Sequence, residues 1–141
     1  MVHRRRLQLA LSAALIALAG IPIARAAGPS IVLKLTGGTG TRRIDCAGKK
    51  PDPYAVVKRG SKVRLTGLVR PVPAAPRWHV TITVSRCTNQ HFHPSWSRVV
   101  LGHPNGSFQT VFVARTPGLY MARAVSGDGK TRKQRFIVIA A

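Results

Sequence analysis

Apolar and polar residues alternate through most of this chain after residue 53, which is the pattern of strands with one buried face. The longest example is the segment 78–87, in which every second residue is large and apolar. Because successive side chains of a strand point to opposite faces, the sequence predicts one core-facing row in this segment. That row contains Trp78, Val80, Ile82 and Val84.

Similar short segments recur about every 8 to 12 residues, separated by turns that contain Gly, Pro or Asn. The predicted strands are 31–35, 54–58, 62–69, 78–87, 97–101, 108–114, 119–126 and 135–140. Asn105–Gly106 predicts a hairpin turn between two of them, because both positions of a tight hairpin turn need positive φ. Helical periodicity is absent after residue 26. The pattern therefore predicts an all-β, antiparallel sandwich of seven to eight strands.

The first 26 residues have a different character. Basic residues at His3–Arg6 precede an apolar run over 7–23 and a small-x-small motif at Ala24–Ala26. This order predicts a helical secretory signal peptide with cleavage before Ala27. A retained transmembrane anchor is the alternative, but the run is near the lower limit for a span and is broken by Gly and Pro. Cleavage implies a secreted or extracytoplasmic protein.

The same patterns divide the chain into three parts. Residues 1–26 are the predicted signal peptide, and 27–53 form an N-terminal strand and loop. Residues 54–141 form the predicted β-sandwich. About 115 residues remain after cleavage, which suits a single small domain.

The part from Tyr54 to Ile139 resembles the bacterial immunoglobulin-like sandwiches of secreted and cell-surface proteins. The segments that carry the resemblance are Gly60–Gly67, Asn105–Phe108 and Pro117–Ala124. The resemblance implies that Phe108 and Tyr120 are inward-facing core aromatics and that Gly118 forms a corner. It also implies a non-catalytic role in adhesion, spacing or ligand display, although many functions use this architecture.

Cys46 and Cys87 are the only two cysteines. In an oxidising compartment they are expected to pair with each other, with an intermolecular bridge or a free thiol as the alternatives. In an unbulged strand Cys87 falls on the face opposite Val84 and points away from the core. The bridge would then differ from the disulfide of antibody domains, which lies between the two sheets.

Charge is the most unusual feature of the composition. The chain has 23 Lys and Arg against three acids and no glutamate, and the part after residue 26 keeps a net charge of +16. Such an excess predicts attraction to an anionic polymer or cell-surface component, with no specific nucleic acid implied. Codon bias is the alternative, since Arg outnumbers Lys, but it does not explain the missing glutamate. The predicted polyanion-binding residues are Lys58, Arg59, Lys62, Arg64, Lys130, Arg132, Lys133 and Arg135.

His91 and His93 are weak candidates for a metal site. In an extended chain a His-x-His motif places both rings on one side, and imidazole suits copper or zinc. The neighbouring residues look like a surface loop, however, and a third ligand would depend on the fold. A metal-binding extracytoplasmic protein is therefore the alternative function.

Catalytic motifs are not evident. Asp45, Asp52 and Asp128 each lie in a stretch flanked by Gly or Pro, where aspartate favours turns. No paired carboxylates, Gly-x-Ser-x-Gly elbow or phosphate-binding loop is found. The sequence predicts no enzyme and no cofactor, and a small enzyme remains as a third hypothesis. The main prediction is a secreted, non-catalytic β-sandwich module that binds an anionic cell-surface or extracellular target, with an undetermined oligomeric state.

The last two predicted strands are largely apolar on both faces. Their outward-facing residues would be Leu119, Met121, Arg123 and Val125 on the first strand and Ile137 and Ile139 on the second. A sheet with one wet face should alternate apolar with polar residues, so something is expected to cover this surface. Our hypothesis is that the disulfide holds residues 31–35 over it, with a partner protein as the alternative cover.

Overall fold

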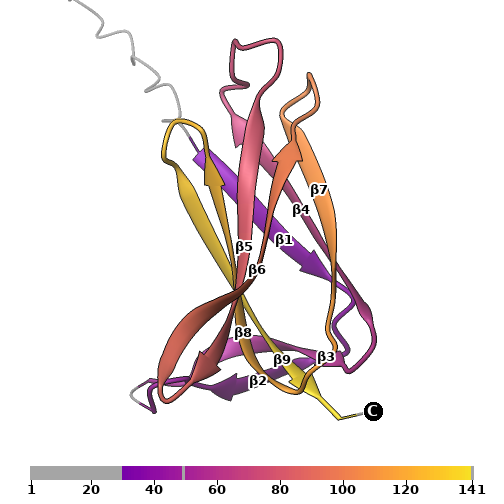
Figure 1. Cartoon of the computed structure of the whole chain (residues 1–141), viewed down its shortest axis with the longest axis vertical. Coiled ribbons are helices and arrows are strands. Elements are labelled where there is room, and N and C mark those ends of the chain that lie inside the picture. Colours follow the sequence, from indigo (N-terminus) through magenta and orange to yellow (C-terminus); the bar gives the residue numbers. More distant parts are fainter. Residues whose placement is uncertain (1–29, 49, 141) are drawn as a thin grey trace, which may run out of the picture.

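The structure is a computed structural model and describes residues 30–48 and 50–140 (Figure 1). The predicted signal peptide and its cleavage site lie outside the described residues. Within them the chain forms nine strands and no helix long and apolar enough to cross a membrane. The strands are β1 (Ser30–Thr36), β2 (Thr41–Ile44), β3 (Asp52–Lys58), β4 (Lys62–Arg70), β5 (His79–Thr88), β6 (His91–Leu101), β7 (Ser107–Val113), β8 (Gly118–Ser126) and β9 (Thr131–Ile139).

The strands form two sheets, so the predicted all-β class is confirmed and the architecture is compatible with a β-sandwich (Figure 1). The three-stranded sheet has the order β1-β4-β7, and the six-stranded sheet has the order β2-β3-β9-β8-β5-β6. Every pair is antiparallel except β3 with β9, which is parallel. The sandwich was predicted to begin at residue 54. β1 and β2 precede this residue, and each is a strand of one of the two sheets.

The core lies between the sheets and follows the alternation of the sequence. Val80, Ile82 and Val84 are fully buried on β5, and Phe108 and Tyr120 are buried as the resemblance implied. Further apolar residues, on the other strands or directly beside β5 and β7, complete the same cluster: Ile31, Leu33, Val57, Val63, Leu65, Val69, Trp78, Val100, Phe112, Ala114, Ala122, Ala124, Phe136 and Val138. The core thus uses one face of each sheet, as period-2 alternation requires.

The hairpin predicted at Asn105–Gly106 is wrong, although a turn is present there. β6 pairs with β5 and β7 pairs with β4, so the chain crosses from one sheet to the other at this point. A two-residue hairpin of the expected type needs positive φ at both positions, and only Gly106 has it, at 87°. The side chain of Asn105 instead accepts hydrogen bonds from the backbone and the hydroxyl of Ser107.

A two-residue hairpin turn is found where the sequence indicated a loop. Asn89 and Gln90 have φ values of 50° and 64° and join β5 directly to β6. Because this turn is so short, β6 begins at His91, six residues before the predicted start. β2 was missed for a different reason: all four of its residues are exposed, so it has no alternation of burial to detect.

The disulfide between Cys46 and Cys87 is confirmed, with 5.8 Å between the two Cα atoms. Cys87 lies on β5, whereas Cys46 follows β2, and β3, β9 and β8 lie between these strands. At about 4.8 Å per strand, β3 and β5 are roughly 14 Å apart. The loop that carries Cys46 must therefore cross the outer face of the six-stranded sheet to reach Cys87. The bridge lies outside the core, as predicted from the position of Cys87 on the strand face opposite Val84.

The hypothesis that residues 31–35 cover this outer face is wrong. That segment is β1, which pairs with β4 in the other sheet and sends Ile31 and Leu33 into the core. Tyr54 of β3 also lies on this outer face. Its side chain points away from the face that carries the core-facing Val57, and it is 0% exposed. Beside this cover the outward-facing apolar residues of β8 and β9 are half-buried: Leu119, Met121, Ile137 and Ile139.

Candidate anion-binding groove

A groove of about 690 Å³ runs between β6 and β7, which are edge strands of different sheets. It exists because the three-stranded sheet ends at β7, while the six-stranded sheet extends beyond it through β5 and β6. Inward-facing side chains at this margin are therefore only partly covered. The lining comprises Arg86, Ser95, Trp96, Ser97, Arg98, Val111, Phe112, Val113, Arg115, Thr116 and Tyr120.

Aromatic rings form the apolar part of the groove. Trp96 of β6 meets Phe112 of β7 edge to face, with 5.6 Å between the ring centroids. Phe112 in turn contacts Tyr120 at 5.9 Å, and Tyr120 stacks on Phe136 at 5.2 Å. The hydroxyl of Tyr120 donates to the carbonyl of Thr116 at 2.8 Å, which ties the end of the groove to β8. These contacts give the groove a packed, rigid base.

Three arginines line the groove. Arg86 lies on β5 and donates from Nη2 to the carbonyl of Pro117 at 2.8 Å, while its buried Nε has no partner. Arg98 of β6 and Arg115, just after β7, are exposed. The lining contains no carboxylate. Because a guanidinium presents several donors in a planar fork, this arrangement suits carboxylate, sulfate or phosphate groups.

A second hollow of about 550 Å³ continues the groove, since it shares Arg98 and Val111 with the first. It adds Arg64 of β4 and the edge of β6 at Val99 and Leu101. Thr110 lies on its wall with a hydroxyl that is buried and has no hydrogen-bond partner. We use the name "arginine groove" for the two hollows together, with Arg64, Arg86, Arg98 and Arg115 as their cations.

The first predicted basic cluster lies near one end of the arginine groove. Lys58, Arg59 and Lys62 surround the turn between β3 and β4, and this turn exchanges backbone hydrogen bonds with Ala114. Ala114 directly precedes Arg115 of the groove. Arg64, the fourth residue of the cluster, lies in the groove itself.

The second predicted basic cluster is not joined to the first. Lys130, Arg132 and Lys133 lie at the beginning of β9, whereas Lys58 pairs with Ile139 at its end. Nine residues of strand, or about 30 Å, separate the two ends. The fourth residue of this cluster, Arg135, forms an ion pair with Asp52 at 3.3 Å and is half-buried. The eight predicted residues therefore do not form one surface.

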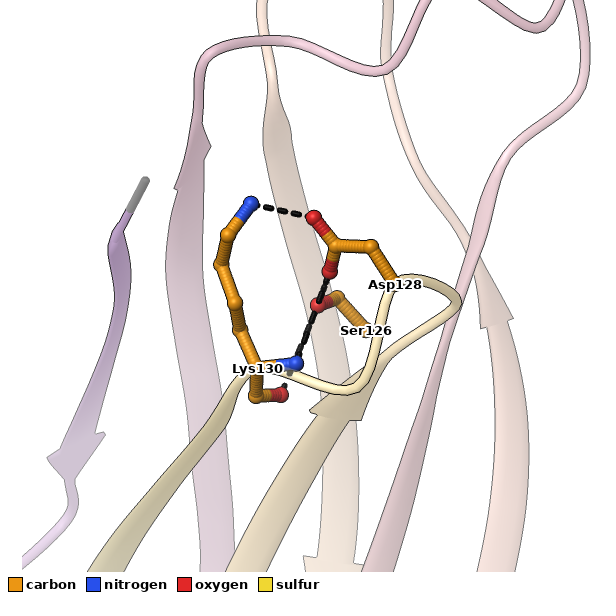
Figure 2. Close-up of polar contacts among 3 residues, drawn as sticks. All are labelled: Ser126, Asp128 and Lys130. Carbon is orange, nitrogen blue, oxygen red and sulfur yellow. Dashed lines mark hydrogen bonds and ion pairs between the residues drawn. The ribbon is translucent and has the colours of Figure 1, made fainter. Parts of the chain in front are cut away.

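Asp128 has a structural role in the turn between β8 and β9. Its carboxylate accepts from the Lys130 ammonium and the Ser126 hydroxyl (Figure 2). The hydrogen bonds from Lys130 and Ser126 lower the pKa of Asp128 from 3.8 to about 2. The turn is closed by a 2.9 Å bond from Gly129 N–H to the Ser126 carbonyl. This aspartate bonds within its own turn, as the flanking glycines indicated.

The other two acids lie near the outer-face cover. Asp52 pairs with Arg135, and Asp45 also has an interaction partner. Burial raises the pKa of Tyr54, the Arg135 guanidinium opposes this effect, and both carboxylates add to it. None of the three acids lines the arginine groove.

His91 and His93 are both exposed near the start of β6, and His93 pairs across the strands with Arg86. In the part of the chain that the structure describes, no three His, Cys, Asp or Glu side chains come together as a metal site would require. The nearby arginine also disfavours a second cation.

Comparisons with known proteins identify no family. No protein-family model matches the chain, and no curated protein matches it. Among solved structures, a similar one is the superoxide reductase (neelaredoxin) from Ignicoccus hospitalis, with 9% sequence identity and a TM-score of 0.42. The match covers 79% of this chain and 80% of that one. Similarity at this level does not indicate a shared function.

Proposed function

We propose that this protein is a non-catalytic binding module that acts outside the cytoplasm and holds an anionic polymer in the arginine groove. The observation that carries the proposal is the gathering of Arg64, Arg86, Arg98 and Arg115 along one groove without a carboxylate. Since charged hydrogen bonds to a guanidinium are strong, each anionic group of a polymer would find a donor there.

The location and the fold family are parts of the same proposal. The disulfide suggests an oxidising, extracytoplasmic environment, and the basic and apolar leader supports secretion through a cleaved signal peptide. The strand order supports an immunoglobulin-like sandwich, because β4 and β7 belong to one sheet and β5, β6, β8 and β9 to the other, as strands B and E face strands C, C′, F and G in that fold. The bond from Tyr120 to the Thr116 carbonyl resembles the tyrosine corner of such domains.

The chemistry of the groove supports the non-catalytic part of this proposal. Its lining offers hydroxyl and guanidinium groups, but no histidine, cysteine or carboxylate that would exchange a proton near neutral pH. Asp52 and Asp128 are engaged in ion pairs elsewhere. A groove with donors and aromatic rings is suited to retention of a ligand.

The test compares two double variants that lose the same charge. One is Arg98→Gln with Arg115→Gln in the groove, and the matched control is Arg123→Gln with Arg132→Gln, which are exposed on β8 and β9 outside it. Binding to immobilised dextran sulfate is measured over a range of salt. We expect the groove variant to bind roughly tenfold more weakly or worse, with a shallower salt dependence, and the control to change little.

Two outcomes would reject this assignment. Equal losses in both variants would show that the overall charge binds the polymer and that the groove has no special part. Retention of the unmodified protein no stronger than that of a neutral β-sandwich would reject anionic-polymer binding altogether.

A further inference from the structure

The two sheets have four edge strands, and two of these are protected. β2 is only four residues long and carries Arg42 and Arg43, a short charged edge of the kind that discourages pairing. At β1 the side chain of Gln134, from β9, donates to the Leu33 carbonyl at 2.8 Å. Backbone groups at these edges are thus limited in number or already bonded.

The other two edges, β6 and β7, flank the arginine groove and are less protected. β6 has a proline, Pro94, and an unpaired residue, Ser95, where its pairing with β5 shifts. From Trp96 to Leu101 the strand pairs regularly with β5, and no other described strand pairs with its opposite edge. Such an edge presents unpaired backbone N–H and C=O groups to any extended chain.

Side chains along this part of β6 alternate in chemistry. Arg98 lies on the groove side, opposite the buried Ile82, whereas Val99 and Leu101 project from the other face with 63% and 67% of their surface exposed. They are the two most exposed large hydrophobic residues among those the structure describes. A third, Val111, lies across the groove on β7.

We propose that the arginine groove receives an extended acidic polypeptide, which adds to β6 as a further strand and carries acidic and apolar residues in alternation. The inference rests on the proposed function and names the class of its ligand. In an added strand, every second side chain would face Arg98 and the other groove arginines, and the remainder would lie beside Val99 and Leu101. Residues 96–101 provide about 20 Å of edge, enough for a strand of about six residues.

Other occupants fit these observations less well. A second copy of this chain would bring another large positive charge against the same arginines. The chain has no acidic segment to fold back, because its only acids are three separate aspartates. Polysaccharides and nucleic acids have no backbone that pairs with a strand edge, and they do not explain the exposed Val99 and Leu101.

The experiment uses peptides of about eight residues with blocked ends. In the first peptide, Asp and Val alternate. The second has the same composition with all Asp residues before all Val residues, and the third alternates Asn with Val. Affinity for the full protein is measured by titration calorimetry, with dextran sulfate as the polymer control. We expect the alternating acidic peptide to bind roughly tenfold tighter than either control peptide and to compete with dextran sulfate.

Two variants and one structural readout sharpen this test. Val99→Thr with Leu101→Thr should weaken binding of the alternating peptide more than binding of dextran sulfate, and Val32→Thr, at an exposed apolar site on β1, should leave both unchanged. Amide hydrogen exchange should show new protection along residues 96–101 when peptide is bound.

The outcomes separate the two proposals. Equal binding of the two acidic peptides, or protection confined to β7, would overturn strand addition to β6 and leave anionic-polymer binding intact. Failure of dextran sulfate and all peptides to bind would overturn both. Concentration-dependent self-association through the β6 edge without peptide would overturn the acidic-polypeptide proposal in favour of a second copy.

Discussion

The two margins of the six-stranded sheet contrast in how their surfaces are completed. At the margin formed by β2 and β3 the outer face is covered by Tyr54 and by the loop that the disulfide ties to β5. Asp52 there is paired with Arg135. At the β6 margin two large apolar side chains are exposed, and the described residues that line the arginine groove include no carboxylate to balance the arginines. The contrast supports our proposal that one margin stabilises the fold and that the other binds a ligand.

The largest expected effect is at the closed margin. Tyr54→Ala removes a fully buried ring beneath the Cys46 loop, and should destabilise the protein by about 3 to 5 kcal/mol. Tyr54→Phe is the matched control, because it keeps the ring and removes only the hydroxyl. Urea unfolding with the disulfide intact measures both variants. A Tyr54→Ala midpoint equal to that of the unmodified protein would mean that the cover contributes no stability.

The next effect concerns the turn that connects the two walls of the groove. Gly106 has φ of 87°, and an added Cβ would lie 2.6 Å from the Val69 carbonyl oxygen. Gly106→Val should therefore destabilise the protein by roughly 1 to 3 kcal/mol. Because the turn joins β6 to β7, affinity for dextran sulfate should fall as well. Gly127→Val is a suitable control, since a Cβ there meets nothing within 4 Å. Equal unfolding midpoints for the two variants would contradict the constraint at Gly106.

The sequence predicts those features of each margin that depend on neighbouring residues. It does not predict those that depend on contacts between segments far apart in the chain. The buried row Val80, Ile82 and Val84 follows from local alternation, and it was predicted correctly. Pairing of Cys46 with Cys87 followed from their number and the expected compartment. Which segment the bridge holds over the sheet was not predicted correctly. The identity of this segment depends on strand order, and alternation does not encode strand order.

The arginine groove illustrates the same limit. Arg86, Arg98 and Arg115 are isolated in the sequence, whereas the predicted basic clusters were runs of neighbouring residues. Their gathering depends on β6 and β7 joining different sheets, and the Asn105–Gly106 hairpin prediction placed these strands in one sheet. One signal was available: β6 and β5 are joined by Asn89–Gln90, and asparagine tolerates positive φ better than most residues. A regular strand beginning there would have placed Ser97 opposite Ile82, and it is the register shift at Ser95, which the sequence does not signal, that brings Arg98 to this position.

The smallest expected effect is a loss of stability at acid pH. It distinguishes the ion pair of Asp128, which depends on pH, from the arginine groove, which does not. The pKa of Asp128 in the folded protein is about 2, below its usual value of 3.8, so its ionised form is favoured by folding. Its contribution to stability is therefore complete above pH 3.8 and is lost as the pH falls towards 2. The effect should be modest, because the side chain is 48% exposed and solvent screens its ion pair.

Asp128→Asn tests this expectation, with urea unfolding measured between pH 2 and pH 6. The stability difference between the unmodified protein and the variant should shrink as the pH falls through this range. Dextran sulfate binding at the same pH values should persist for as long as the protein is folded, because neither guanidinium nor sulfate titrates there. A stability difference that is constant with pH would show that the ion pair in Figure 2 does not act through the ionised carboxylate. Loss of polymer binding while the protein is still folded would show that a titrating group, and not only the arginines of the open margin, contributes to the groove.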